Sequence, residues 1–126
     1  MLMYRAAAVV IAVIAAVHLY IAWFEIFAWT TRGPAVFSSF PRDLFEETTA
    51  IAANQGLYNA FLSAGLIWSL LIREQKWRIN VGICFLLFVI VAGVFGAVTV
   101  SSRIMLVQTA PATLGLVLLM LARRRV

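Results

Sequence analysis

Two ionisable side chains lie within the first long apolar stretch of the sequence. His18 and Glu25 are seven residues apart, so on a helix they share one face and are separated by two turns, ~10.8 Å along the axis. A histidine can change its charge near neutral pH, and a carboxylate can hold a cation or exchange a proton. Because ionisable groups are costly inside a membrane span, both residues are candidates for a functional site.

A second polar group occurs in the segment Asn54-Gln55-Gly56-Leu57-Tyr58-Asn59. On a helix, Asn54 and Tyr58 share one face, and Gln55 and Asn59 share the adjoining face, about 100° away. Lipid cannot hydrogen-bond to these side chains, so the sector should face protein or a water-filled cavity. The alternative is that the amides only join neighbouring helices and that Tyr58 packs with its hydroxyl satisfied.

The composition is that of a membrane protein. Of 126 residues, 64% are hydrophobic and 12% are charged, whereas a soluble domain carries about 25% charged residues. Four transmembrane helices are expected, at residues 6–29, 47–72, 79–100 and 105–122, in a single all-α domain covering residues 1–126. The first is too long for the apolar region of a cleaved signal peptide, about 7–15 residues. The predicted fold is an integral membrane four-helix bundle.

Residues 30–42 form the longest expected connection. They contain Gly33-Pro34, Ser38-Ser39 and Pro41, which favour turns or helix ends. Asp43 and Glu46 have the spacing of a capping box that would open the second helix. A start at Ser39, with Pro41 in the first turn, is the alternative.

The basic residues indicate the orientation in the membrane. Three of them fall on one side, at Arg32, Arg42 and Arg103, and seven on the other: Arg5, Arg73, Lys76, Arg78, Arg123, Arg124 and Arg125. By the positive-inside rule, the second side and both termini are expected to be cytoplasmic. This placement accounts for the net charge of +5 without a nucleic-acid partner, and it predicts a multi-pass protein of the plasma membrane.

Depth along the helices places the polar groups in the outer half of the bilayer. With ~1.5 Å rise per residue, Glu25 lies about 6 Å and His18 about 16 Å below Trp29. Asn59 has a similar depth to His18, and Gln108 lies near the outer end of the fourth helix. Pro111 should open that helix beside Gln108. We therefore expect an outward-facing polar pocket, in which His18 lies within hydrogen-bond reach of Asn59 or Tyr58.

Small residues recur at four-residue spacing in the third expected helix, as Ala92/Gly96 and Gly93/Ala97. This pattern allows helix backbones to approach closely and could support a homodimer through Gly93 and Gly96. The single cysteine, Cys84, lies in an apolar run and is interpreted as a small buried hydrophobe. No metal site or cofactor is predicted.

The segment Asn54 to Asn59 resembles a family of small, mainly bacterial membrane proteins, the domain-of-unknown-function family 1304. The likeness extends over nearly the whole chain and includes His18 and Glu25, Ala92-Gly93 and Gly96, and Gln108 with Pro111-Ala112. The resemblance implies a four-helix membrane fold and no established activity.

Three functions fit these features. The first is binding or transport of a small polar or cationic solute in contact with His18, Glu25, Asn54, Gln55, Tyr58, Asn59 and Gln108. The second is an integral-membrane enzyme that uses His18 and Glu25 for acid–base chemistry on a lipid-like substrate, although two turns of helix separate these groups. The third is a structural or assembly subunit in which the polar groups serve packing alone. The sequence leaves any catalytic residue unknown.

Overall fold

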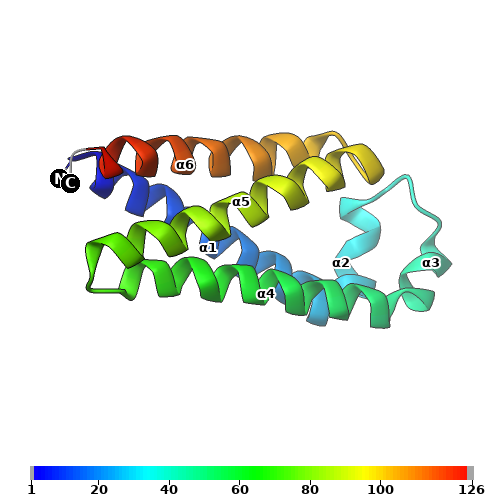
Figure 1. Ribbon diagram of the computed structural model, residues 1–126. Helices are drawn as coiled ribbons and strands as arrows, with labels where there is room; N and C mark the ends of the chain where they lie inside the picture. Colours follow the sequence, from blue (N-terminus) through cyan, green and yellow to red (C-terminus); the bar gives the residue numbers. More distant parts are fainter. Residues whose placement is uncertain (1, 125–126) are drawn as a thin grey trace. The chain divides into compact units, whose positions relative to one another are not determined.

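The computed structural model describes residues 2–124 and is all-helical over that range. This confirms the expected all-α class. The helices are α1 (Leu2–Phe27), α2 (Trp29–Val36), α3 (Arg42–Glu47), α4 (Thr49–Leu71), α5 (Gln75–Thr99), the π-helical segment η1 (Met105–Thr109) and α6 (Ala110–Arg123) (Figure 1).

The chain divides into two compact units. Unit 1 comprises Met1–Ala16 with Leu62–Val126, and unit 2 comprises Val17–Phe61. Helices α1 and α4 belong to both units, because each of them continues from one unit into the other.

Unit 1 is built around an apolar core where α1, α4, α5 and α6 pack together. Its fully buried members are Ala7, Ile11, Ile14, Ala15, Leu66, Ile79, Leu86, Val89, Ala112 and Leu119. One buried polar side chain adds a directed contact: the Ser63 hydroxyl of α4 donates to the backbone oxygen of Ala15 in α1 at 2.8 Å. Such a bond satisfies a hydroxyl that apolar surroundings would otherwise leave unpaired.

The close contact between α5 and η1 depends on glycine. A Cβ at Gly93 would overlap the Thr109 hydroxyl and come within 3.1 Å of the Thr109 backbone nitrogen. At Gly96 a Cβ would lie 3.2 Å from the Ile104 side chain. The small residues expected to mediate a close helix crossing are therefore used inside unit 1, and a homodimer through this helix stays a prediction.

The helix opens just before Pro111, as expected. Residues Met105–Thr109 form a π-helical turn, in which the Ala110 backbone nitrogen donates to the oxygen of Met105. Proline has no N–H, and its ring clashes with the carbonyl four residues earlier, so the chain widens by one residue at this point.

Unit 2 holds two short helices where a connection was expected. Pro34 lies inside α2, and Phe24, Trp29, Phe37, Phe40 and Phe45 form a chain of ring contacts with centroids 5.2–6.4 Å apart. The Trp29 indole also donates to the Thr48 hydroxyl at 3.0 Å. Packing between residues distant in sequence thus stabilises α2 despite its Gly-Pro pair.

The expected capping box is wrong. α3 begins at Arg42 after Pro41 with no side-chain cap, and the Asp43 carboxylate accepts from the adjacent Leu44 nitrogen at 3.2 Å. The chain then turns at Thr48 before α4 begins. Neither predicted start, at Asp43 or at Ser39, matches, because Pro41 has the extended φ/ψ that ends the preceding turn.

Three helices are long and apolar enough to cross a membrane: Leu2–Phe27, Gln75–Thr99 and Met105–Arg123. They expose large apolar side chains such as Val98 and Leu106, which is compatible with a multi-pass membrane protein. α4 is not among the three. Cys84 of α5 is exposed, so its expected burial is wrong: it lies on the outward surface of its helix.

Candidate functional site

The centre of the site in unit 2 is a close crossing of α1 and α4 at Gly56. A Cβ at this position would lie 2.7 Å from Ile26 Cγ1, 3.0 Å from the backbone oxygen of Ala22 and 3.1 Å from Glu25 Cβ. Any larger residue would have to displace backbone as well as side-chain atoms. The missing side chain at Gly56 therefore allows the two helices to approach at the level of Ala22 and Glu25.

The crossing brings together one half-buried polar pair. The Asn59 amide nitrogen donates to the Glu25 carboxylate at 2.9 Å, and also to the backbone oxygen of Gln55 at 3.2 Å. Glu25 and Asn59 are both half-buried. The structure thus joins two of the predicted site residues from different helices.

Helix direction explains why these side chains meet. α1 and α4 run side by side in opposite directions (Figure 1), and side chains in a helix lean towards its N-terminus. Glu25 lies beyond Ala22 on α1 and leans back towards it, while Asn59 lies beyond Gly56 on α4 and leans back towards Gly56. Both side chains therefore converge on the level of the glycine contact.

The Glu25 carboxylate has no cationic partner within residues 2–124. Arg32, which could have paired with it, places its guanidinium over the Trp23 ring, 5.1 Å from the centroid. Glu25 also lies in the last turn of α1, which carries no basic residue. Because the C-terminal end of a helix has a partial negative charge, this position makes the electrostatic potential around the carboxylate more negative.

His18 is buried on the same face of α1 as Ala22 and Glu25. Its side chain is 1% exposed, and positions 18, 22 and 25 fall on one side of a helix. The two protons of the Asn59 amide are directed to Glu25 and Gln55. The contact expected between His18 and Asn59 stays a prediction.

The expected polar sector on α4 is divided rather than continuous. Asn54 and Tyr58 are each two residues from Gly56, which places them on the opposite side of the helix, and both are exposed. The Tyr58 ring lies near Phe61, with centroids 6.3 Å apart. Gln55 is exposed as well. The interpretation that all four polar residues face α1 is therefore corrected to Asn59 alone.

Gln108 belongs to unit 1. It lies half-buried in η1, and its Cβ is 3.1 Å from where a Cβ at Gly93 would be. Beside it, the Thr109 hydroxyl is buried and has no hydrogen-bond partner within the described residues. Gln108 therefore lies at the crossing of α5 and η1. No group of three His, Cys, Asp or Glu that could hold a metal ion occurs in residues 2–124.

The sequence reasoning missed Gly56 as a contact residue. The signal was available, because Ala52, Gly56 and Ala60 form a run of small residues at four-residue spacing on α4. That pattern is the same one that singled out the third expected helix. Among the surrounding amides, only the one placed close to the glycine contact reaches α1.

The fold and site define an all-helical protein with membrane-compatible helices and a carboxylate–amide pair between two of them. The chain belongs to the family described as "Protein of unknown function (DUF1304)", whose model matches residues 12–120. This confirms the resemblance noted from the sequence, and the match includes His18, Glu25 and Asn59. No curated protein matches the chain, and neither does any solved structure.

Proposed function

We propose that this protein spans the membrane four times and binds a small monovalent or organic cation at Glu25, from the outer side. The observation that carries the proposal is the hydrogen bond between the half-buried Glu25 carboxylate and the uncharged Asn59 amide. A carboxylate within a membrane span is costly unless a cation or a proton neutralises it. An amide orients the carboxylate but leaves its charge uncompensated.

α4 is the fourth span of this proposal. Its 23 residues rise ~35 Å, which is enough to cross the ~30 Å hydrocarbon core. Its polar motif lowers its hydropathy, but Asn59 and Gly56 are directed towards α1. With both termini cytoplasmic, as the basic residues favour, Glu25 lies near the outer end of α1.

The surroundings of Glu25 favour a cation over a neutral solute. The carboxylate and the C-terminal end of α1 both contribute negative potential. Trp23, two residues away, lies on the opposite side of α1 and carries the Arg32 guanidinium over its ring, so its ring is not part of the site. The negative potential alone can attract an alkylammonium group, so choline serves as a probe of this site.

His18 provides a group through which cation binding can be coupled to protonation. It lies two turns further into the membrane than Glu25 on the same face of α1, and an imidazole is a side chain that can exchange a proton. A proton on His18 would weaken cation binding through like-charge repulsion. Exchange of a proton for the cation would make the protein a transporter rather than a binding protein.

The test uses choline and its neutral isostere, 3,3-dimethylbutanol, as probes. The purified protein in zwitterionic detergent is titrated with each at constant ionic strength, and the melting temperature is recorded. We expect choline to stabilise the protein more than the isostere does. Glu25→Gln, which keeps a hydrogen-bond acceptor for Asn59, should weaken choline binding at least tenfold, or about 1.4 kcal/mol.

Glu47→Gln is the matched control, because Glu47 is exposed at the end of α3. It should leave the choline response unchanged. Equal responses to choline in the wild type and in Glu25→Gln would refute the cation site and leave Glu25 and Asn59 as a packing pair. Uptake of labelled choline into proteoliposomes then separates transport from binding alone.

A further inference from the structure

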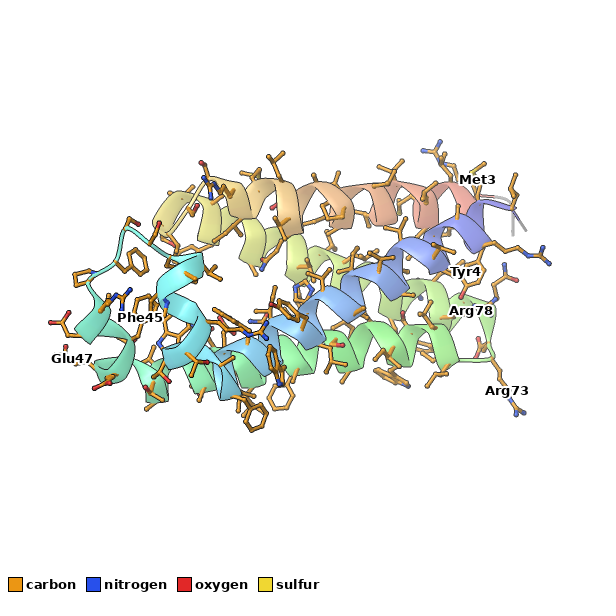
Figure 2. The ribbon with its side chains drawn as sticks, turned by 180° about the vertical axis from the view of Figure 1, so that it is seen from behind. Met3, Tyr4, Phe45, Glu47, Arg73 and Arg78 are labelled. Carbon is orange, nitrogen blue, oxygen red and sulfur yellow. The ribbon has the colours of Figure 1, made fainter. Side chains whose placement is uncertain are left out.

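Basic side chains from three separate segments gather at one end of unit 1. The first turns of α1, the turn between α4 and α5, and the last turn of α6 lie at the same end (Figure 1). Tyr4, Arg73 and Arg78 mark this end in Figure 2. We call it the basic end, and its members are Arg5, Arg73, Lys76, Arg78, Arg123 and Arg124.

The charges of the basic end are not neutralised within the protein. Glu74 is the one acidic residue in the segments that form it, and no ion pair involves these six residues within the described part of the chain. Five of the six are exposed. The end therefore presents a concentrated positive potential to whatever surrounds it.

Arg78 gives this surface a fixed geometry. Its guanidinium carbon lies 4.1 Å from the centroid of the Tyr4 ring, which joins the start of α5 to the start of α1. The side chain is half-buried, and its Nε is buried without a hydrogen-bond acceptor among residues 2–124. A guanidinium stacked on an aromatic ring keeps its edge free for the oxygen atoms of an anion.

We propose that the basic end binds the headgroups of anionic phospholipids in the cytoplasmic leaflet. Next to it, Trp77 is 56% exposed and Leu2 is 75% exposed. A Trp at this level is typical of the membrane–water interface, and exposed apolar side chains suit the acyl chains of a lipid. A bound lipid would place its phosphate against Arg78 and its chains along the helices, whereas a soluble anion would use only the charges.

The contributions of the exposed basic side chains to the affinity for anionic lipid are expected to be additive. Near an anionic membrane surface, each Lys or Arg contributes about 1 kcal/mol, or roughly fivefold in affinity. Removing two charges should therefore weaken lipid binding about 25-fold. The interaction should also decrease with salt, because the exposed charges are screened over about 10 Å at 0.1 M ionic strength.

The experiment compares phosphatidylglycerol with phosphatidylcholine of the same acyl chains. Each lipid is titrated into the purified protein in neutral detergent, and binding is followed through the melting temperature at low and high salt. We expect phosphatidylglycerol to stabilise the protein more, with the difference reduced in high salt. Arg123→Gln combined with Arg124→Gln should weaken phosphatidylglycerol binding about 25-fold. Arg78→Lys, which keeps the charge, should weaken it less.

Two controls keep the test decisive. Arg42→Gln combined with Arg103→Gln also removes two exposed charges, but outside the basic end, and should leave lipid binding unchanged. Equal losses in both double variants would overturn the proposal, because net charge alone would then explain the effect. Inorganic phosphate should not reproduce the stabilisation; if it did, the surface would be a phosphate site and not a lipid site. None of these outcomes depends on Glu25.

Discussion

Replacing Gly56 with Ala tests whether the close crossing of α1 and α4 holds the site together. The added Cβ would lie 2.7 Å from Ile26 Cγ1 and 3.0 Å from the backbone oxygen of Ala22. Neither atom is the free end of a flexible side chain, so the helices must separate. Overpacking of this kind costs about 1–3 kcal/mol, and the better helix propensity of Ala returns about 0.8–1.0 kcal/mol.

We therefore expect Gly56→Ala to lower the free energy of unfolding by about 0–2 kcal/mol. The matched control is Gly115→Ala in α6, another buried glycine. Its Cβ would meet Val10 at 3.3 Å and Leu86 at 3.4 Å, close to ordinary van der Waals contact. There the helix propensity of Ala dominates, so the control should be unchanged or more stable by up to ~1 kcal/mol.

The assay is reversible unfolding of the purified protein in mixed micelles with increasing denaturing detergent. Gly56→Ala with a stability equal to or above that of Gly115→Ala would refute the reasoning. A second readout makes the test specific to the site. Because wider helix separation stretches the hydrogen bond between Asn59 and Glu25, the coupling energy of that pair should decrease in the Gly56→Ala background.

Three further predictions use the same purified protein or intact cells. Asn59→Leu should cost about 1–3 kcal/mol of unfolding free energy when Glu25 is present, because it removes the partner of a half-buried carboxylate; an equal cost in a Glu25→Leu background would contradict this. Gly93→Leu should destabilise unit 1 more than Gly115→Leu, since it meets the backbone of η1, and equal melting temperatures would contradict it. A cysteine at Ser38, in a cysteine-free background, should react with an impermeant maleimide in intact cells; labelling only after permeabilisation would reverse the topology.

Hydropathy was enough to locate the long helices. α1, α5 and α6 with η1 occupy the apolar stretches of the sequence, and the helical opening before Pro111 follows from the chemistry of proline alone. These features depend on local sequence, which is why they could be predicted. The expected single domain of four spans does not follow from local sequence alone, because it also depends on how α4 and the two units are placed.

The region before α4 could not be predicted in this way. Gly33 and Pro34 favour a turn locally, but a Cβ at Gly33 would lie 2.6 Å from the Phe45 ring. Gly33 is therefore buried beneath an aromatic side chain that lies twelve residues later in the sequence. Contacts of this kind outweigh local helix propensity, and nothing in the spacing of Gly33, Pro34 and Phe45 indicates them.

The division of the polar motif between two faces of α4 could not be predicted for the same reason, because it depends on a contact with another helix. Periodicity gives the angle between Asn54, Tyr58 and Asn59 around α4, but it does not say which face meets α1. Gly56 decides this, because only the face with the missing side chain can approach closely. Asn59 lies 60° from Gly56 around the helix, whereas Asn54 and Tyr58 lie about 160° away.

One helix cannot place both faces of this motif against α1, so the two asparagines must be satisfied differently. In the proposed four-span arrangement, Asn54 lies five residues from the start of α4, or ~7.5 Å, and so is near the outer interface, where water can reach it. Tyr58, 53% exposed, lies four residues or ~6 Å deeper than Asn54 on the same face, and its side chain leans towards the N-terminal, outer end of α4. Asn59 lies deeper and has Glu25 instead of water. The carboxylate between α1 and α4 is thus the polar group that the lipid environment leaves to be neutralised by a cation or a proton.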